Sequence, residues 1–313
     1  MTHRLLGLVL CCIACSTGPQ QSAITDVAEQ LGYDGTVEQA PGVADVSEED
    51  LEPPQQVVRV GTFNVRNGVA NDGPDSWKNR ADLLVEVFAD LGADVVGVQE
   101  AWIFQLEYIR EGMPLYDWVG ISRAGGDLDE FCAIFYRTDR FQEVDSGTFW
   151  LSDTPDVPSK FEGQALPRIC TWVHLQPLDG SAPFYLFNTH FTHLNLPEVR
   201  AESAQLILDR MAELGGTAGA FLTGDFNAAP GSLAYEVLAG HNAQPGPLLD
   251  PWAQLDLPEE GTFHGFTGKA LSTRIDWVLH GPDWTAQEAT VIQQNKEGAY
   301  PSDHFPVVAT VYR

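Results

Sequence analysis

Short apolar runs that end at a polar or charged residue recur from Val57 to the C-terminus, and they constrain the fold more than any other feature. Runs of about four to eight Val, Ile, Phe, Leu or Trp residues are typical of buried strands. Polar residues within or beside these runs are Asn64, Glu100, His190, Asp225, Asn227, Asp276, Asp303 and His304. Carboxylates, amides and imidazoles brought together from several strand ends suit metal-assisted hydrolysis of a phosphoester.

Strand-like runs alternate with amphipathic segments over the same part of the chain. The expected strands cover residues 57–63, 94–99, 132–137, 146–151, 169–175, 184–190, 219–225, 274–280, 289–293 and 305–312. Apolar residues spaced three and four apart predict helices over 77–91, 102–111 and 198–214, and a short helix over 231–239. Two stretches that alternate strand and helix flank a strand-rich middle. This order favours the α/β (α+β) class, with two mixed β-sheets packed face to face and helices outside, a four-layer α/β/β/α sandwich.

The N-terminal region predicts export. Residues 1–15 combine Arg4 with a short apolar run that ends at Ala14 and Cys15, which reads as a signal peptide with a lipobox-like end and lipidation of Cys15. An ordinary cleaved signal peptide is the alternative. Residues 16–56 hold nine acidic and no basic residues, so we expect an acidic disordered tether. The catalytic domain is then 57–313, in a monomer at the bacterial cell envelope whose only membrane contact is the lipid anchor. Without the lipid, the protein is expected to be periplasmic or secreted.

The chain is strongly acidic, with 17 basic and 44 acidic residues and a net charge of −27. The segment 16–56 contributes −9 and Arg4 contributes +1, which leaves −19 for residues 57–313. Binding of long nucleic acids usually requires a basic face, so this charge argues against them. A bound divalent cation can still supply positive charge at one site.

Two of the five cysteines, Cys132 and Cys170, lie in expected strands of the domain. An oxidising compartment would permit a disulfide between them. Two buried, unpaired thiols are the equal alternative, because the sequence does not give the distance between their Cα atoms.

The motifs VGTFNVR, DVVGVQE, FNTH, TGDFN and RIDWVL, with Asp303–His304, resemble the endonuclease/exonuclease/phosphatase superfamily, whose members have the deoxyribonuclease I-like fold. The resemblance covers 57–313 and keeps the family's motif order. It implies a phosphoesterase that uses a divalent metal, Mg²⁺ in most members, with Mn²⁺ or Ca²⁺ as alternatives. Metal-assisted attack of water on a phosphodiester or phosphomonoester is the implied reaction.

Five residues are expected near the metal and the attacking water. The resemblance makes Glu100 the principal metal ligand and Asp303 an additional carboxylate on the metal side. Asp225 would orient or deprotonate the water. The resemblance also implies that Asn64 orients Glu100 or contacts the phosphate, and that Asn227 donates a hydrogen bond to a phosphate oxygen.

Five further residues are expected to handle protons and phosphate charge. His190 and His304 form the family's histidine pair, with Asp276 as the carboxylate partner of His304 and Glu130 as that of His190. A carboxylate on one ring nitrogen fixes the tautomer and raises the imidazole pKa. Arg168 matches a phosphate-contacting arginine of the family.

Several questions stay open at this stage. Arg66 stands where apurinic endonucleases carry an Asp, which puts a second metal in doubt. The substrate could be a short nucleic acid, in which case the protein is a nuclease, or a nucleotide, sugar phosphate or phospholipid headgroup. The alternative from another class is a non-catalytic surface or binding protein with the same fold.

Overall fold

The structure is a computed structural model that describes residues 55–240 and 247–313. The predicted signal peptide, the lipidation of Cys15 and nearly all of the predicted tether fall outside these residues and stay predictions. Within the described ranges, no helix has the length and apolar composition needed to cross a membrane.

The strands form two sheets. The six-stranded sheet has the order β10-β11-β1-β2-β4-β3, and the five-stranded sheet has the order β5-β6-β7-β8-β9. Most neighbours are antiparallel, but β1 pairs with β2 and β7 pairs with β8 in parallel, so both sheets are mixed. The bounds are β1 Val57–Asn64, β2 Val95–Ala101, β3 Tyr116–Val119, β4 Phe131–Arg137, β5 Phe141–Trp150, β6 Ile169–Pro177, β7 Phe184–His190, β8 Ala220–Asp225, β9 Asp276–His280, β10 Thr285–Val291 and β11 Val307–Tyr312.

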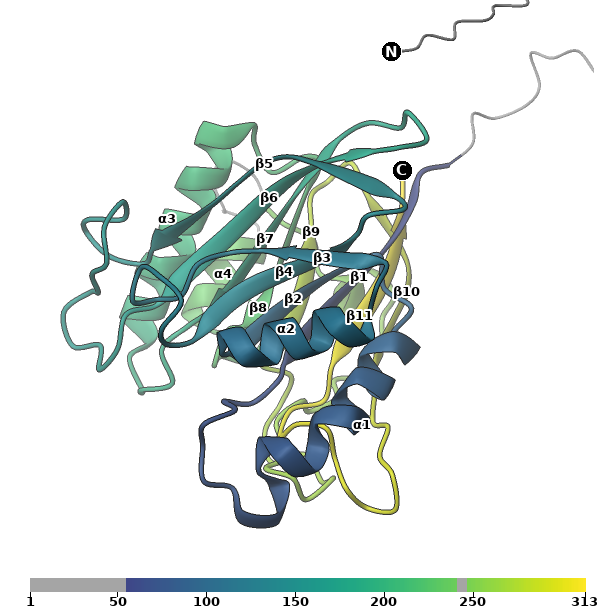
Figure 1. Cartoon of the computed structure of the whole chain (residues 1–313). Coiled ribbons are helices and arrows are strands. Elements are labelled where there is room, and N and C mark those ends of the chain that lie inside the picture. Colours follow the sequence, from purple (N-terminus) through teal and green to yellow (C-terminus); the bar gives the residue numbers. More distant parts are fainter. Residues whose placement is uncertain (1–54, 241–246) are drawn as a thin grey trace, which may run out of the picture. The chain divides into compact units, whose positions relative to one another are not determined.

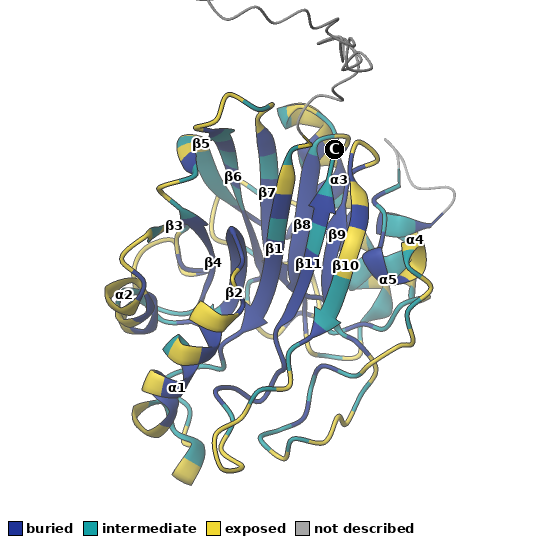
Figure 2. Cartoon of the chain, turned by 90° about the vertical axis from the view of Figure 1, so that its right-hand side faces the viewer, coloured by how far each residue is buried: buried dark blue, intermediate teal, exposed yellow. Residues whose placement is uncertain are grey.

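Helices cover the outer face of each sheet, and the fold is the predicted four-layer sandwich (Figure 1). The helices are α1 Trp77–Asp90, α2 Ile103–Gly112, α3 Pro197–Leu214, α4 Leu233–Ala239 and α5 Pro251–Gln254, with a 3₁₀ turn at Gly73–Asp75. One apolar cluster joins α1 and α2 to the six-stranded sheet. Another joins α3 and α4 to the five-stranded sheet. The central strands are buried along most of their length, whereas α1 exposes its outer face (Figure 2).

The layer between the sheets is apolar at one end. Val58 and Val60 of β1 point into it and pack with Leu186 and Phe221 of the facing sheet. Side chains alternate between the two faces of a strand, so the intervening positions of β1 face α1 and α2 instead. Each of these four side chains is fully buried.

The other end of the same layer is polar. Gln99 donates hydrogen bonds to Thr62 at 2.9 Å and to Asn188 at 2.6 Å, and Thr223 donates to Asn188 at 3.2 Å. A side chain at Gly97 would collide with Thr223 and Asn188, so glycine is what lets the sheets approach this closely. The polar network lies directly below the strand ends that carry the predicted site.

The sequence analysis did not predict one edge strand and one short helix, and it placed the start of two other edge strands too late. The strand β3 was not predicted, and β5 and β10 begin before the predicted residues 146 and 289. All three are edge strands, and most positions of β5 and β10 are exposed or half-buried. Their composition therefore lacks the continuous apolar run of a central strand. The four-residue helix α5 is too short to show a period.

The two cysteines are free and buried. Cys132 packs with Trp150 and Ile169, whereas Cys170 belongs to the cluster beneath α3. Burial raises the pKa of both thiols. The structure therefore favours the buried-thiol alternative over the disulfide.

Candidate active site

A cavity of about 540 Å³ opens at the strand ends above the polar network. Eight of the predicted site residues line it, namely Glu100, Glu130, Arg168, His190, Asp225, Asn227, Asp303 and His304. The other two, Asn64 and Asp276, are hydrogen-bonded to lining residues. Asn64 donates to Asp225, and Asp276 accepts from His304. The structure thus brings together all ten positions that the sequence singled out in the domain.

Strand register explains this convergence. His190 ends β7 and pairs with Asp225, which ends β8 and pairs in turn with Asp276 at the start of β9. Asn64 ends β1 next to the carboxyl end of β2, where Glu100 lies. Glu100 has a φ of 63° and Asn227 a φ of 48°, a region that non-glycine residues seldom occupy. Such backbone strain is common at functional sites because the surrounding fold sustains it.

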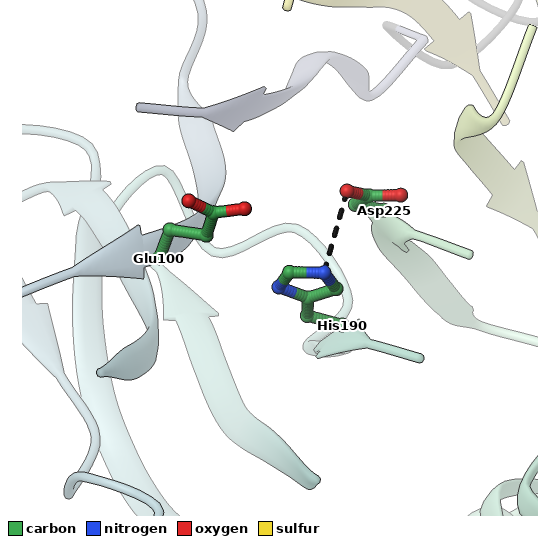
Figure 3. Close-up of side chains that lie close together, drawn as sticks. All are labelled: Glu100, His190 and Asp225. Carbon is green, nitrogen blue, oxygen red and sulfur yellow. Dashed lines mark ion pairs between the residues drawn. The ribbon is translucent and has the colours of Figure 1, made fainter. Parts of the chain in front are cut away.

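Asp225 is the centre of the constellation. Its Oδ2 accepts a hydrogen bond from Asn64 at 3.0 Å and lies 3.4 Å from His190 Nε2 and 3.8 Å from His304 Nε2. Its Oδ1 accepts from the backbone N–H of Asn227 at 3.0 Å. Burial, with the nearby charge of Asp276, raises the pKa of Asp225 to about 7. Figure 3 shows the His190 ring directed at Asp225, with Glu100 beside the two residues.

His304 is held as a cation. Its Nδ1 lies 2.9 Å from Asp276 Oδ2. Burial lowers the His304 pKa, but the charges of Asp276 and Asp225 outweigh it and raise the value to about 10. The predicted His304–Asp276 pair is therefore present, with Nε2 left to face the cavity.

The segment around Thr262 positions that pair. Thr262 Oγ1 accepts from the backbone N–H of Asp276 at 3.3 Å, and its carbonyl accepts from the N–H of Phe305 at 2.8 Å. The ring of Phe263 packs against His304 with centroids 5.1 Å apart. One segment thus fixes both chain stretches that carry the pair, and no sequence signal marked it.

The predicted partner of His190 is not where the sequence placed it. Glu130 accepts from Asn67 at 2.7 Å and from Arg123 at 2.8 Å, and has no hydrogen bond to His190. His190 Nδ1 has no partner among the described residues. Burial, with the charge of Arg168, lowers the His190 pKa well below its usual value. Glu130 pairs with Arg123 instead, because an ion pair compensates both buried charges. Arg123 belongs to no motif that the sequence analysis recognised.

The two predicted metal carboxylates face the same side of the cavity. Glu100 accepts from Asn64 at 3.1 Å and from the backbone N–H of Asn67 at 2.9 Å. Burial opposes ionisation of Glu100, but the hydrogen bond from Asn64 and the charge of His304 lower its pKa overall. Burial raises the pKa of Asp303. A carboxylate oxygen of Glu100, a ring nitrogen of His190 and a carboxylate oxygen of Asp225 all lie within 4.8 Å of one another.

The carboxylates of Glu100 and Asp303, which both line the cavity, fit a hard divalent cation. Mg²⁺ prefers oxygen ligands and usually takes one or two carboxylates from the protein. Arg66 lies beside the carboxylates, with NH1 3.9 Å from Glu100 and Nε 3.7 Å from Asp303. Asp72 anchors that guanidinium with two hydrogen bonds of 3.0 and 2.8 Å. A fixed cation at this place limits how many metal ions the carboxylates can hold.

Arg168 and His193 extend the cavity wall beyond His190. Arg168 NH2 lies 3.2 Å from His193 Nδ1, and the Arg168 side chain is 5% exposed. Burial lowers the pKa of both groups. Sequence reasoning included Arg168 and left His193 out, because a histidine in a loop carries no signal by itself.

Arg80 on α1 ties two loops of the site together. It is 2% exposed and donates to the carbonyls of Val65 and Pro301, both at 2.7 Å, and to that of Arg66 at 2.9 Å. These carbonyls flank Asn64 on one side and Asp303 on the other. The sequence did not predict this role of Arg80, because an arginine in an amphipathic helix is ordinarily exposed.

Comparison with known proteins is consistent with this geometry. The model of the endonuclease/exonuclease/phosphatase family matches residues 61–304. An endonuclease/exonuclease/phosphatase family protein from Bacteroides thetaiotaomicron is 34% identical, with a TM-score of 0.76 over 82% of this chain and 98% of that one. The mannosyl-6-phosphatase of B. thetaiotaomicron VPI-5482 is 35% identical, with a TM-score of 0.73 over 81% and 99%. Carbon catabolite repressor protein 4 homolog 4 from Arabidopsis thaliana is 22% identical over 74% of this chain and 70% of that protein.

Proposed function

Because the chain belongs to the endonuclease/exonuclease/phosphatase family, whose members hydrolyse phosphoric esters, we propose that it is a divalent-metal-dependent hydrolase of a small phosphoester. The observation that carries this proposal is the set of contacts around Asp225. One carboxylate reaches His190, His304 and Asn64 in a cavity flanked by Glu100 and Asp303.

Glu100 and Asp303 are the proposed metal ligands, with Mg²⁺ as the metal. When bound, the ion would polarise the phosphoryl group and offset its negative charge. Glu100 suits this role because Asn64 and Asn67 fix its orientation before any ion arrives. Arg66 favours a single ion over two.

The side chains on the other wall handle the proton and the phosphate. His304, held cationic by Asp276, presents Nε2 as a donor to a phosphoryl oxygen. Asp225 accepts the proton of the attacking water, since its raised pKa brings it close to neutral pH, where a general base is effective. Asn227 keeps Asp225 oriented through its backbone and contributes its amide to the substrate phosphate.

The size of the substrate follows from the cavity and the charge. A volume of about 540 Å³ suits a whole small molecule. The net charge of −19 over 57–313 disfavours long polyanions. The similarity to a mannosyl-6-phosphatase supports a phosphomonoester as the favoured substrate. A phosphodiester is the second candidate, because metal-assisted attack of water can cleave either kind of ester.

The test measures hydrolysis of p-nitrophenyl phosphate and bis(p-nitrophenyl) phosphate by the full chain. We expect activity with Mg²⁺, loss of activity with a chelator, and recovery when Mg²⁺ is restored. His304→Ala should lose activity by about 100-fold or more, with an unchanged circular dichroism spectrum. A chain that binds Mg²⁺ and hydrolyses neither these two esters nor a panel of natural phosphomonoesters and diesters would be the non-catalytic binding protein instead.

A further inference from the structure

One wall of the cavity is not used by the proposed chemistry. It consists of Asn67, Arg123, Glu130, Arg168 and His193, which come from four different loops. These five residues line the same cavity as Asp225 and His304. A group attached to a phosphate at Asp225 can therefore reach it. We call these five residues the loop wall.

The loop wall is built around a buried ion pair. Arg123 is 7% exposed and donates to Glu130 at 2.8 Å and to Asp129 at 2.9 Å. Glu130 also accepts from Asn67 at 2.7 Å. Each Glu130 oxygen thus has one protein donor and keeps a free lone pair, because a carboxylate oxygen accepts about two hydrogen bonds.

Arg168 adds free donors beside those free acceptors. Its contact with His193 is the one side-chain hydrogen bond it makes among the described residues. The guanidinium has five N–H donors, so most of them are available to a ligand in the cavity. Arg168 lines the cavity, so these donors face the space that a ligand would occupy.

The charges of the loop wall indicate what kind of group fits. Arg123 and Arg168 are balanced by Asp129 and Glu130, so the wall has no net charge to attract a second phosphate. Glu130 would repel another anion. Hydroxyl groups both donate and accept, and a pair of them matches a carboxylate next to a guanidinium.

A nucleobase fits less well. Base recognition commonly uses an aromatic face on which the base can stack. Among the described lining residues, Phe263 is the one Phe, Tyr or Trp side chain, and it packs against His304 on the opposite wall.

We propose that the loop wall binds the neutral, polyhydroxylated part of a sugar phosphate, with Glu130 accepting from and Arg168 donating to its hydroxyl groups. This inference rests on the proposed phosphoesterase function and assigns the residues that select the substrate. It also gives Glu130 a role in specificity in place of the predicted pairing with His190.

The experiment compares kcat/KM of the full chain for glucose 6-phosphate and mannose 6-phosphate with kcat/KM for phenyl phosphate and adenosine 5′-monophosphate. We expect a preference for at least one hexose phosphate over both others. In Glu130→Gln the ratio of hexose phosphate to phenyl phosphate should fall about 10-fold to 100-fold, as for a lost hydrogen bond to a charged group. Asp127→Asn is the matched control, because Asp127 is an exposed carboxylate of the same loop and does not line the cavity. Its ratio should stay within about twofold of the wild type, as for a change outside the binding surface.

The outcomes are distinct. If Glu130→Gln lowers activity on every substrate equally, Glu130 acts in the chemistry and the inference is wrong. If phenyl phosphate is hydrolysed at least as well as both hexose phosphates by the wild type, the substrate class is wrong but the proposed function stands. If nothing is hydrolysed, the proposed function fails, and calorimetry decides the inference. Tighter binding of a hexose 6-phosphate than of inorganic phosphate supports it, and equal binding overturns it.

Discussion

The two ends of the layer between the sheets differ in chemistry although the same strands build both. At one end Val60 and Phe221 meet in a dry apolar core. At the other end Gln99, Asn188 and Thr223 share hydrogen bonds beneath the cavity. The pairing of β2 with β4 shifts register between Val98 and Ala101, at the polar end. The difference in chemistry comes from the side chains that the strands carry at each end.

The comparison separates stability from function within one fold. Apolar burial stabilises at roughly 25 cal/mol per Å², whereas a buried hydrogen-bonded network adds little net stability but a defined geometry. We infer that the apolar end supplies most of the stability, and that the polar end holds Asn64, Glu100 and Asp225 in position. Four variants test this division.

Asp225→Asn should have the largest effect, on activity alone. Asp225 contacts both histidines and Asn64, so its loss should lower kcat by about 10⁴-fold, near 5 kcal/mol of activation free energy. The free energy of unfolding should be unchanged or higher, because folding raises the pKa of Asp225 and the ionised carboxylate therefore opposes folding near neutral pH. Steady-state kinetics and urea unfolding measure the two quantities. Asp209→Asn on the exposed face of α3 is the control, and a loss of stability without loss of rate would break the division.

Phe221→Ala should have the next largest effect, on stability alone. Phe221 is fully buried and packs against Phe184 and Trp284. Removing such a ring costs about 3–5 kcal/mol. Urea unfolding gives the loss, and kcat corrected for the folded fraction should stay within a few-fold of the wild type. A 100-fold fall in corrected kcat would show that the two ends are not separable.

Asn188→Leu should affect both properties to a smaller extent. Asn188 donates to the carbonyls of Val98 and Ala133, both at 2.9 Å, and accepts from Gln99. Leucine fills the space but leaves these groups unpaired, at a cost of about 2–4 kcal/mol. We expect kcat to fall about 10-fold, because Gln99 precedes Glu100 and would keep its hydrogen bond to Thr62 but lose the one to Asn188. Leu186→Asn, the reverse change at the apolar end, should lower stability without that fall in kcat.

His264→Asn should have the smallest effect, and only in acid. Burial lowers the pKa of His264 from 6.5 to about 4. Between these two pH values the unfolded chain binds a proton that the folded chain does not. The contribution of neutral His264 to the free energy of unfolding is therefore fully present above pH 6.5 and is lost as the pH falls toward 4. At pH 5 this group accounts for about 2 kcal/mol. Asparagine can still accept from the Gly268 N–H.

Urea unfolding of both proteins at pH 7.5 and pH 5 measures this effect. The variant should lose about 2 kcal/mol less than the wild type on acidification. Equal losses in the two proteins would mean that His264 does not titrate differently in the folded and unfolded states.

The sequence predicted the central strands well and the edge strands poorly. The strands β1, β2, β7 and β8 are continuous apolar runs because both of their faces are buried. The strand β5 exposes much of one face, and only its last residues carry an apolar signal.

Most of the site could be predicted for a related reason. Asn64, Glu100, His190 and Asp225 each lie at the end of an apolar run, so strand pairing carries them to one rim. Arg123 and Arg80 could not be predicted, because their roles depend on loops and carbonyl groups that meet them only in the folded chain.

The sequence by itself determined the two-sheet sandwich, the rim where the polar residues gather and the family, because each is encoded in local runs and their order. The tertiary structure alone decided which charges pair. Glu130 is hydrogen-bonded to Arg123 and Asn67 rather than to His190. The guanidinium of Arg66 lies within 4 Å of both Glu100 and Asp303. Side-chain pairing depends on ångström distances between segments far apart in the chain, and local sequence does not contain those distances.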